Sequence, residues 1–182
     1  MPSADEYVHL ARSYDWEDLQ SLWKDIMAGN TPGWPPGKAL EHLVLRAFEL
    51  NGAEVVWPFE VKISGKIAEQ IDGVVYSDGL ICLVECKDTN EREDVEPIAK
   101  LQYKLLRRPS GVLGALISKN GFTDPAIRLA QYQIPKAILL WEGNDISFAL
   151  EKRSITNALR LKYRIYVEHG APDYLLREEE TQ

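Results

Sequence analysis

Glu85 and Lys87 are the residues whose types and spacing most clearly point to chemistry. They close the segment Leu80–Lys87, which is otherwise apolar. Side chains two positions apart on a strand point to the same side, so Glu85 and Lys87 would share a face and Cys86 would point to the other. A carboxylate and an ammonium at the end of a buried strand are costly unless they are paired or used. We therefore expect this pair to have a partner group or a function.

Asp72 is the partner group that the sequence offers. It lies in the preceding expected strand, residues 69–76, and Ser77-Asp78-Gly79 is typical of a tight turn into the next strand. Pairing about the centre of this turn would bring Asp72 beside Glu85 and Lys87. Two carboxylates and a lysine would then lie together at the ends of two neighbouring strands.

These groups suit the hydrolysis of a phosphodiester bond. Asp72 and Glu85 would hold a hard cation such as Mg²⁺ (or Mn²⁺) through oxygen ligands, with the backbone carbonyl of Cys86 as a third ligand. The metal would polarise the phosphate and lower the pKa of a bound water. Lys87 would orient that water or stabilise the charge that develops on the phosphate.

The plainer alternative is structural. Glu85 and Lys87 would then form an ordinary ion pair at a strand end, and Asp72 would be a polar residue near a turn. The Glu-x-Lys tripeptide alone is common enough to favour this alternative. An aspartate one hairpin away, inside the element order described next, favours the hydrolytic site.

Hydrophobic periodicity predicts the elements that would position these groups. A helix capped by Asp15 precedes the Thr31–Gly37 segment, which is rich in proline and glycine and cannot form a regular element. The remaining elements alternate strands with helices, which indicates a mixed sheet covered on both faces. We expect helices at 16–27, 38–50, 95–107, 123–133 and 154–168, and strands at 55–63, 69–76, 80–87, 112–118, 136–141 and 146–150.

This order predicts an α/β fold with three parts. Residues 1–37 would be an N-terminal helical appendage with its linker, residues 38–151 the core domain, and residues 152–182 a C-terminal helix and tail. The N-terminal tryptophans could pack on the core or form a partner surface. The basic residues of the terminal helix, Lys162 among them, could be a solvated face or a strip that binds a nucleic-acid backbone.

The composition is that of an ordinary globular domain: 182 residues, 45% hydrophobic and 27% charged. No apolar run is long enough for a membrane span, and the N-terminus lacks the features of a secretion signal, so we expect a cytoplasmic protein. Cys82 and Cys86 would be small buried hydrophobes rather than a disulfide. The net charge of −7 argues against a wide basic surface for duplex DNA.

Several motifs in order resemble one known family. The segment from about residue 41 to 150 is similar to the catalytic domain of Mrr-type restriction endonucleases, in the PD-(D/E)XK superfamily. It departs in having Ile71, not proline, before the first aspartate, and no segment resembles a DNA-recognition domain. The matching segments are Gln70-Ile71-Asp72-Gly73-Val74, Val84-Glu85-Cys86-Lys87, the helix that bears Gln102, Leu116–Thr123 with Ala126 and Ala130 after it, and the strand Ala137–Trp141.

The resemblance implies a restriction-endonuclease-like fold with an αβββαβ core and a metal-dependent cutting centre. It implies that Asp72, Glu85 and Lys87 are the catalytic trio. It also implies that Glu41, on the first core helix, approaches the metal, and that Gln102 faces the active site.

We therefore expect a Mg²⁺-dependent endonuclease that acts on DNA, in restriction, defence or DNA processing. A basic cluster near Gln102 would contact the nucleic acid, and two copies could pair because cutting two strands usually takes two active sites. The alternatives are a catalytically silent interaction module and a nuclease subunit that needs a targeting partner. The residues of the basic cluster are Lys100, Lys104, Arg107 and Arg108.

Overall fold

The computed structural model describes residues 3–132 and 135–177. Its strands are β1 Glu54–Val56, β2 Phe59–Ile63, β3 Lys66–Ile71, β4 Gly73–Ser77, β5 Leu80–Lys87, β6 Val112–Ser118 and β7 Ile138–Glu142. Its helices are α1 Ala4–Arg12, α2 Trp16–Met27, α3 Lys38–Leu50, α4 Val95–Leu106, α5 Asp124–Tyr132, α6 Gly143–Glu151 and α7 Ile155–His169.

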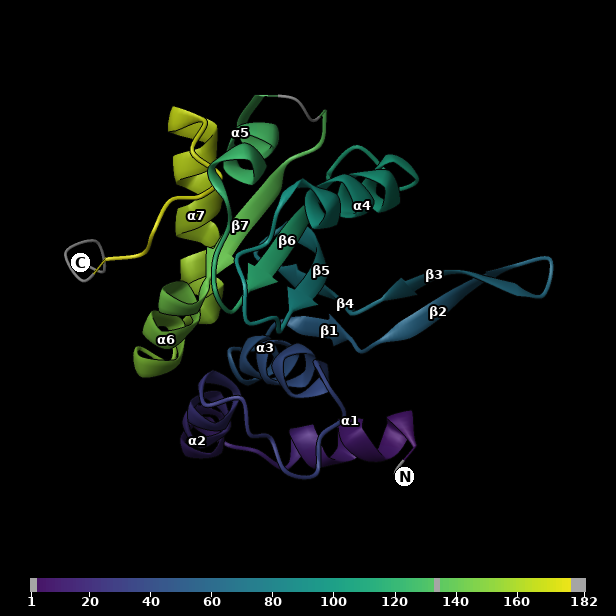
Figure 1. Cartoon of the computed structure of the whole chain (residues 1–182), viewed down its shortest axis with the longest axis vertical. Helices are drawn as coiled ribbons and strands as arrows, with labels where there is room; N and C mark the ends of the chain where they lie inside the picture. The colour runs from purple at the N-terminus through teal and green to yellow at the C-terminus, as the bar shows by residue number, and fades with distance from the viewer. Residues whose placement is uncertain (1–2, 133–134, 178–182) are drawn as a thin grey trace.

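A five-stranded mixed sheet in the order β1-β4-β5-β6-β7 forms the centre of the molecule (Figure 1). β5 is the central strand: it pairs antiparallel with β4 and parallel with β6. β1 and β4 are antiparallel, whereas β6 and β7 are parallel. This arrangement confirms the expected α/β fold with a mixed sheet between helices.

The two faces of the sheet bury two separate apolar clusters. Along β5, Cys82, Val84 and Cys86 contribute to the cluster under α2, α3, α6 and α7. Leu83 belongs to the opposite cluster, under α4 and α5. Because side chains alternate along a strand, Glu85 must lie on the α4 side of the sheet. The two cysteines are free and buried, as expected.

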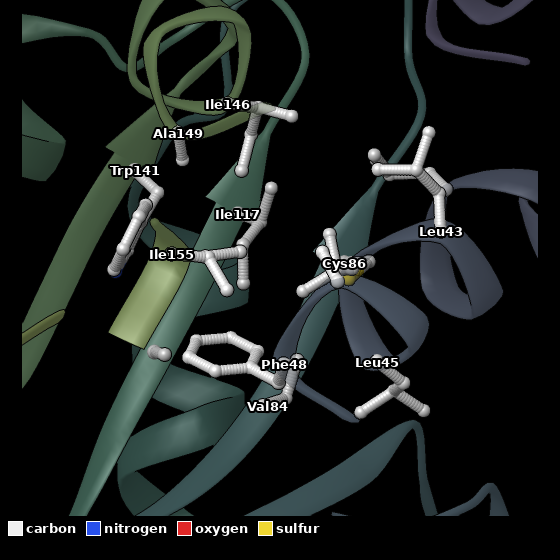
Figure 2. Packing of buried hydrophobic residues seen from close by; sticks show 14 of the residues in the cluster. Leu43, Leu45, Phe48, Val84, Cys86, Ile117, Trp141, Ile146, Ala149 and Ile155 are labelled. Atoms are coloured by element: carbon white, nitrogen blue, oxygen red, sulfur yellow. The ribbon is translucent and has the colours of Figure 1, made fainter. Parts of the chain in front are cut away.

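Side chains from α3 and from the helices after β7 meet over the first of these faces. Figure 2 shows Phe48 of α3 beside Val84, with Ile117, Trp141 and Ile155 close by. Trp23 of α2 joins the same cluster, and its indole nitrogen donates a hydrogen bond to Ser147 Oγ at 2.8 Å. Core packing is therefore the role of Trp23.

The first two expected strands are each divided into two in the structure. We expected continuous strands at 55–63 and 69–76, but each is interrupted, the first at Trp57-Pro58 and the second at Asp72. Proline has no N–H to donate to a ladder, which explains the first break. Beyond both breaks, β2 and β3 pair with each other as a separate hairpin that projects from the body (Figure 1).

A helix replaces the turn and short strand that we expected at 143–150. This helix, α6, starts where the Asp145 carboxylate accepts a hydrogen bond from the Glu142 N–H at 2.9 Å. Ile146, Ala149 and Leu150 are buried at the three- and four-residue spacing of one helix side. The capping contact and this spacing outweigh the turn preference of Gly143.

Asp145 also holds the C-terminal helix and the segment after it. Its carboxylate pairs with Lys162 Nζ at 2.9 Å, and both side chains are fully buried. The same carboxylate accepts the Leu176 N–H at 2.9 Å, and Lys162 also donates to the Tyr174 carbonyl. Burial lowers the pKa of Lys162, although Asp145 opposes the shift. Lys162 is therefore not part of a solvated basic strip.

No helix in the described ranges, 3–132 and 135–177, is both long and apolar enough to cross a bilayer.

Replacing Asp145 with alanine should strongly destabilise the fold. The change leaves the Lys162 ammonium buried without its counterion, which typically costs about 3–5 kcal/mol. Urea unfolding followed by tryptophan fluorescence measures the effect. Glu168→Ala removes the partner of Arg164 in an exposed pair, and it should cost far less because solvent screens the two charges. Equal losses in the two variants would contradict this account of Asp145.

Candidate active site

The register of the β4–β5 hairpin brings the first two carboxylates together. Gly73 pairs with Val84, so continuing the ladder by one residue sets Asp72 opposite Glu85. Asp72 Oδ2 accepts a hydrogen bond from the Cys86 N–H at 2.9 Å, which ties the strand break to the end of β5. Burial raises the pKa of Asp72, and the nearby Glu85 raises it further.

Glu85 lies between two ammonium groups. Lys87 Nζ is 2.8 Å from Glu85 Oε1, and Lys104 Nζ from α4 is 2.6 Å from Glu85 Oε2. Burial opposes ionisation of Glu85, but the two lysines outweigh it, so the pKa of Glu85 is lowered. Burial likewise opposes the charge of Lys87, yet the pKa of Lys87 is raised because Glu85 and Asp72 stabilise the ammonium. The expected ion pair of Glu85 and Lys87 therefore exists, within a larger charge cluster.

Glu41 joins the cluster from α3. Its pKa is raised to about 7, first by burial and then by the negative charge of Asp72. Lys38, one turn earlier on the helix, forms an ion pair with Glu41 Oε2 at 2.6 Å and opposes this rise. α3 approaches closely because Gly73 has no side chain: a Cβ there would lie 2.4 Å from Leu45 Cδ2.

All these groups line one groove with a volume of about 850 Å³. Its floor is the ends of β4 and β5, and its walls come from α3, α4 and the β3 strand of the projecting hairpin. The lining residues are Lys38, Glu41, Ile67–Gln70, Asp72, Glu85–Lys87, Glu96, Ala99, Lys100, Tyr103, Lys104 and Arg107. Another hollow lies beside α7 and is more apolar than this groove. None of these carboxylates lines it.

The groove has the donor set of a divalent cation site. Glu41, Asp72 and Glu85 line the same groove, and the negative charge of Glu85 contributes to the raised pKa values of both Glu41 and Asp72. Carboxylate oxygens are the ligands that Mg²⁺ and Mn²⁺ prefer. Within residues 3–132 and 135–177, no three acidic, histidine or cysteine side chains already surround one point that a metal could fill. Glu41 and Glu85 face lysines instead, so a metal would have to replace these contacts.

The predicted basic cluster lies beside the groove, but all four of its residues already form ion pairs. Lys104 contacts Glu85, while Arg107 and Arg108 both pair with Glu69 at the base of the hairpin, Arg108 at 2.6 Å. Lys100 pairs with Glu96 at 2.6 Å on the exposed side of α4. Lys100, Lys104 and Arg107 line the groove, whereas Arg108 does not.

The structure does not bring Gln102 to the groove. Residues four and seven positions apart share a side of a helix, so Gln102 lies on the buried stripe of Ile98 and Leu105. The residues of α4 that line the groove occupy a different side, at positions 96, 99, 100, 103 and 104. Among the described residues the amide of Gln102 has no hydrogen-bond partner. The expectation that Gln102 faces the active site is therefore corrected by the helix geometry.

Sequence reasoning missed two contacts of the cluster. Lys38 could have been found, because it precedes Glu41 by three positions in an expected helix and such residues are neighbours. The contact between Lys104 and Glu85 has no local signal, because it depends on how α4 crosses the sheet. Lys104 also donates to the Gln70 carbonyl at 2.8 Å and so links the hairpin to Glu85.

Fold and groove together define the restriction-endonuclease-like class, in which a mixed sheet carries acidic residues and a lysine at the ends of two neighbouring strands. A family model described as a restriction endonuclease, the Mrr catalytic domain, matches residues 36–149. The match spans more than half of the chain, so the chain belongs to this restriction endonuclease family. Membership supports a nuclease that acts on DNA, and it confirms the predicted resemblance. No curated protein sequence matches the chain significantly.

Solved structures of restriction endonucleases are similar to this chain. The small subunit of the heterodimeric restriction endonuclease R.BspD6I superposes with a TM-score of 0.53 at 16% identity, over 87% of this chain and 91% of that one. The DNA modification-dependent restriction endonuclease AspBHI gives a TM-score of 0.49 at 15% identity, over 92% of this chain and 43% of that one. The first of these likenesses supports the fold assignment.

Glu41 should make the stability of the metal-free protein depend on pH. Its pKa rises from 4.5 to about 7 on folding, so the folded state binds more protons in this range and stability falls as the pH rises through it. Glu41→Gln removes this loss. In EDTA, the free energy of unfolding of the variant should rise relative to that of wild type as the pH increases from 5 to 8. The expected change in this difference is on the order of 1–3 kcal/mol. Urea unfolding at both pH values measures this, and parallel pH profiles would contradict it.

Proposed function

We propose that the chain is a divalent-metal-dependent endonuclease that hydrolyses phosphodiester bonds in DNA. The observation that carries the proposal is the meeting of Asp72 and Glu85 across the β4–β5 ladder, with Lys87 on Glu85 and Glu41 facing the same groove. The groove gives a phosphodiester strand direct access to these groups. The nuclease core would be residues 38–151, with residues 1–37 and 152–182 as additions to it.

The roles of the residues follow from their chemistry. Asp72, Glu85, Glu41 and the Cys86 carbonyl would hold Mg²⁺ or Mn²⁺, which supplies a polarised phosphate and a more acidic water when bound. Lys87, whose raised pKa keeps it charged, would stabilise the negative charge that develops on the phosphate. Asp72 also orients the end of β5 by accepting the Cys86 N–H.

The nucleic acid would reach the groove between α4 and the hairpin. Lys100, Lys104 and Arg107 line this path, and they would contact the backbone once phosphate competes with their present partners. Because these basic groups are few and the net charge is −7, electrostatic attraction to DNA over the whole surface would be weak.

A second proposal concerns partners. The small subunit of the heterodimeric restriction endonuclease R.BspD6I superposes over 87% of this chain and 91% of its own length. This likeness favours a nuclease subunit that a partner directs to its target. The acidic net charge supports the same idea. A homodimer would also supply the two centres that cutting both strands requires. A silent interaction module is the remaining alternative, and the intact set of Asp72, Glu85 and Lys87 disfavours it.

Cleavage of supercoiled plasmid DNA tests the centre directly. With Mg²⁺ or Mn²⁺, wild type should nick the plasmid, whereas Asp72→Ala and Lys87→Ala should each lose on the order of 100-fold or more in rate, through loss of metal binding and of charge stabilisation respectively. Agarose gels follow the conversion to open circles.

Glu54→Ala is the matched control, because it removes an exposed carboxylate on β1 that does not line the groove. It should cut at the wild-type rate. Cutting that survives both Asp72→Ala and Lys87→Ala would eliminate this centre. A folded wild-type protein that cuts no DNA with either metal would favour the interaction module or a missing partner.

A further inference from the structure

The acidic groups of the groove are neutralised by the chain's own lysines. Lys38 Nζ lies 2.6 Å from Glu41 Oε2. Both oxygens of Glu85 are contacted, one by Lys87 at 2.8 Å and the other by Lys104 at 2.6 Å. Three ammonium groups therefore occupy the positions around these carboxylates from which a divalent cation would approach.

Lys104 is the most firmly held of the three. It comes from α4, outside the strands that carry the acidic groups, and only 17% of its side chain is exposed. Besides Glu85 it contacts the Gln70 carbonyl at 2.8 Å, so its ammonium is fixed from two sides. A divalent ion on Glu85 would lie within a few ångströms of this charge, and the repulsion in a half-buried groove would be strong.

We propose that Lys104 and Lys38 are internal counter-cations that compete with the metal ion for Glu85 and Glu41. The inference rests on the proposed metal-dependent function and adds a control of metal binding. In the free protein these ammonium groups weaken metal affinity. Both lysines line the groove, so a nucleic-acid phosphate there draws them from the carboxylates and favours metal binding. The metal and the nucleic acid then bind cooperatively, and each strengthens the other by the same factor.

Lys87 differs from these two lysines in its position. It follows Glu85 by two residues on the same strand, so the strand keeps Lys87 close to Glu85 even if α3 or α4 moves. Lys38 and Lys104 reach the carboxylates from helices, through long and flexible side chains. They can move toward a phosphate in the groove without a change in the central sheet, and Lys104 then gives up the Gln70 carbonyl as well as Glu85.

Isothermal titration of Mn²⁺ into the free protein tests the competition without any measurement of cutting. Lys104→Met and Lys38→Met keep the side-chain length and remove the charge, and each should bind Mn²⁺ about 5- to 100-fold more tightly than wild type. Lys24→Met is the matched control: it removes an exposed ammonium on α2 that does not line the groove, so its Mn²⁺ affinity should equal that of wild type. Weaker or unchanged binding in both test variants would overturn the proposal.

A second titration tests the coupling to nucleic acid. A DNA duplex with a phosphorothioate backbone should increase the Mn²⁺ affinity of wild type by a larger factor than that of Lys104→Met. An equal increase in the two proteins would overturn the coupling. Circular dichroism and urea unfolding verify that each variant is folded, and Lys38→Met, at a more exposed ammonium, keeps the test open if Lys104→Met does not fold.

Asp72→Asn separates this inference from the proposed function. Mn²⁺ affinity should fall in this variant if the carboxylates form the metal site. Unchanged affinity in Asp72→Asn means that the metal site itself is misplaced. A loss in Asp72→Asn together with no gain in Lys104→Met and Lys38→Met leaves the metal site in place and rejects the lysines as its competitors.

Discussion

The antiparallel register between β4 and β5 is the constraint on which the site depends. Asp72 stands where the ladder stops, and its carboxylate takes the Cys86 N–H in place of a backbone acceptor. This one contact sets two acidic groups from different strands against the same groove. A shift of the register by one residue would send Glu85 and Lys87 to the opposite face, among the apolar side chains under α3. The tight turn at Asp78-Gly79 fixes the register, and the apolar packing on both faces of β5 holds it.

Electrostatics then decides the state of the groove. Burial, and then the repulsion between neighbouring carboxylates, raises the pKa of Glu41 to about 7 and also raises the pKa of Asp72. Ammonium groups from three different elements offset this cost, and two of them, Lys87 and Lys104, lower the pKa of Glu85 despite its burial. The ammonium groups stabilise the carboxylates in the metal-free fold. The same carboxylates are oxygen ligands that a divalent cation could use. Folding and the proposed chemistry therefore depend on the same charges.

The projecting hairpin and α4 form a unit around this centre. Glu69 at the base of β3 is nearly buried and pairs with Arg107 and Arg108, and Lys104 reaches from α4 to the Gln70 carbonyl. Basic residues that seem free in the sequence thus fix the hairpin against the helix. Their position explains how an acidic chain can still offer a narrow basic wall along one groove. The buried pair of Asp145 and Lys162 has the corresponding role on the other side of the molecule, where it joins α6, α7 and the C-terminal segment.

Much of the fold and of the candidate site could be predicted from the sequence, because the sequence patterns that indicate them are local. Alternation along residues 80–87, the turn at Asp78-Gly79 and the spacing of apolar residues in α3 and α4 predicted a mixed sheet between helices, the shared face of Glu85 and Lys87, and the approach of Asp72. Local signals failed where long-range contacts decide the outcome. Only the tertiary structure separated β2 and β3 from the main sheet and brought Lys104 onto Glu85. The physical reason is that periodicity fixes which side of an element a residue occupies, whereas the crossing of elements decides what that side meets.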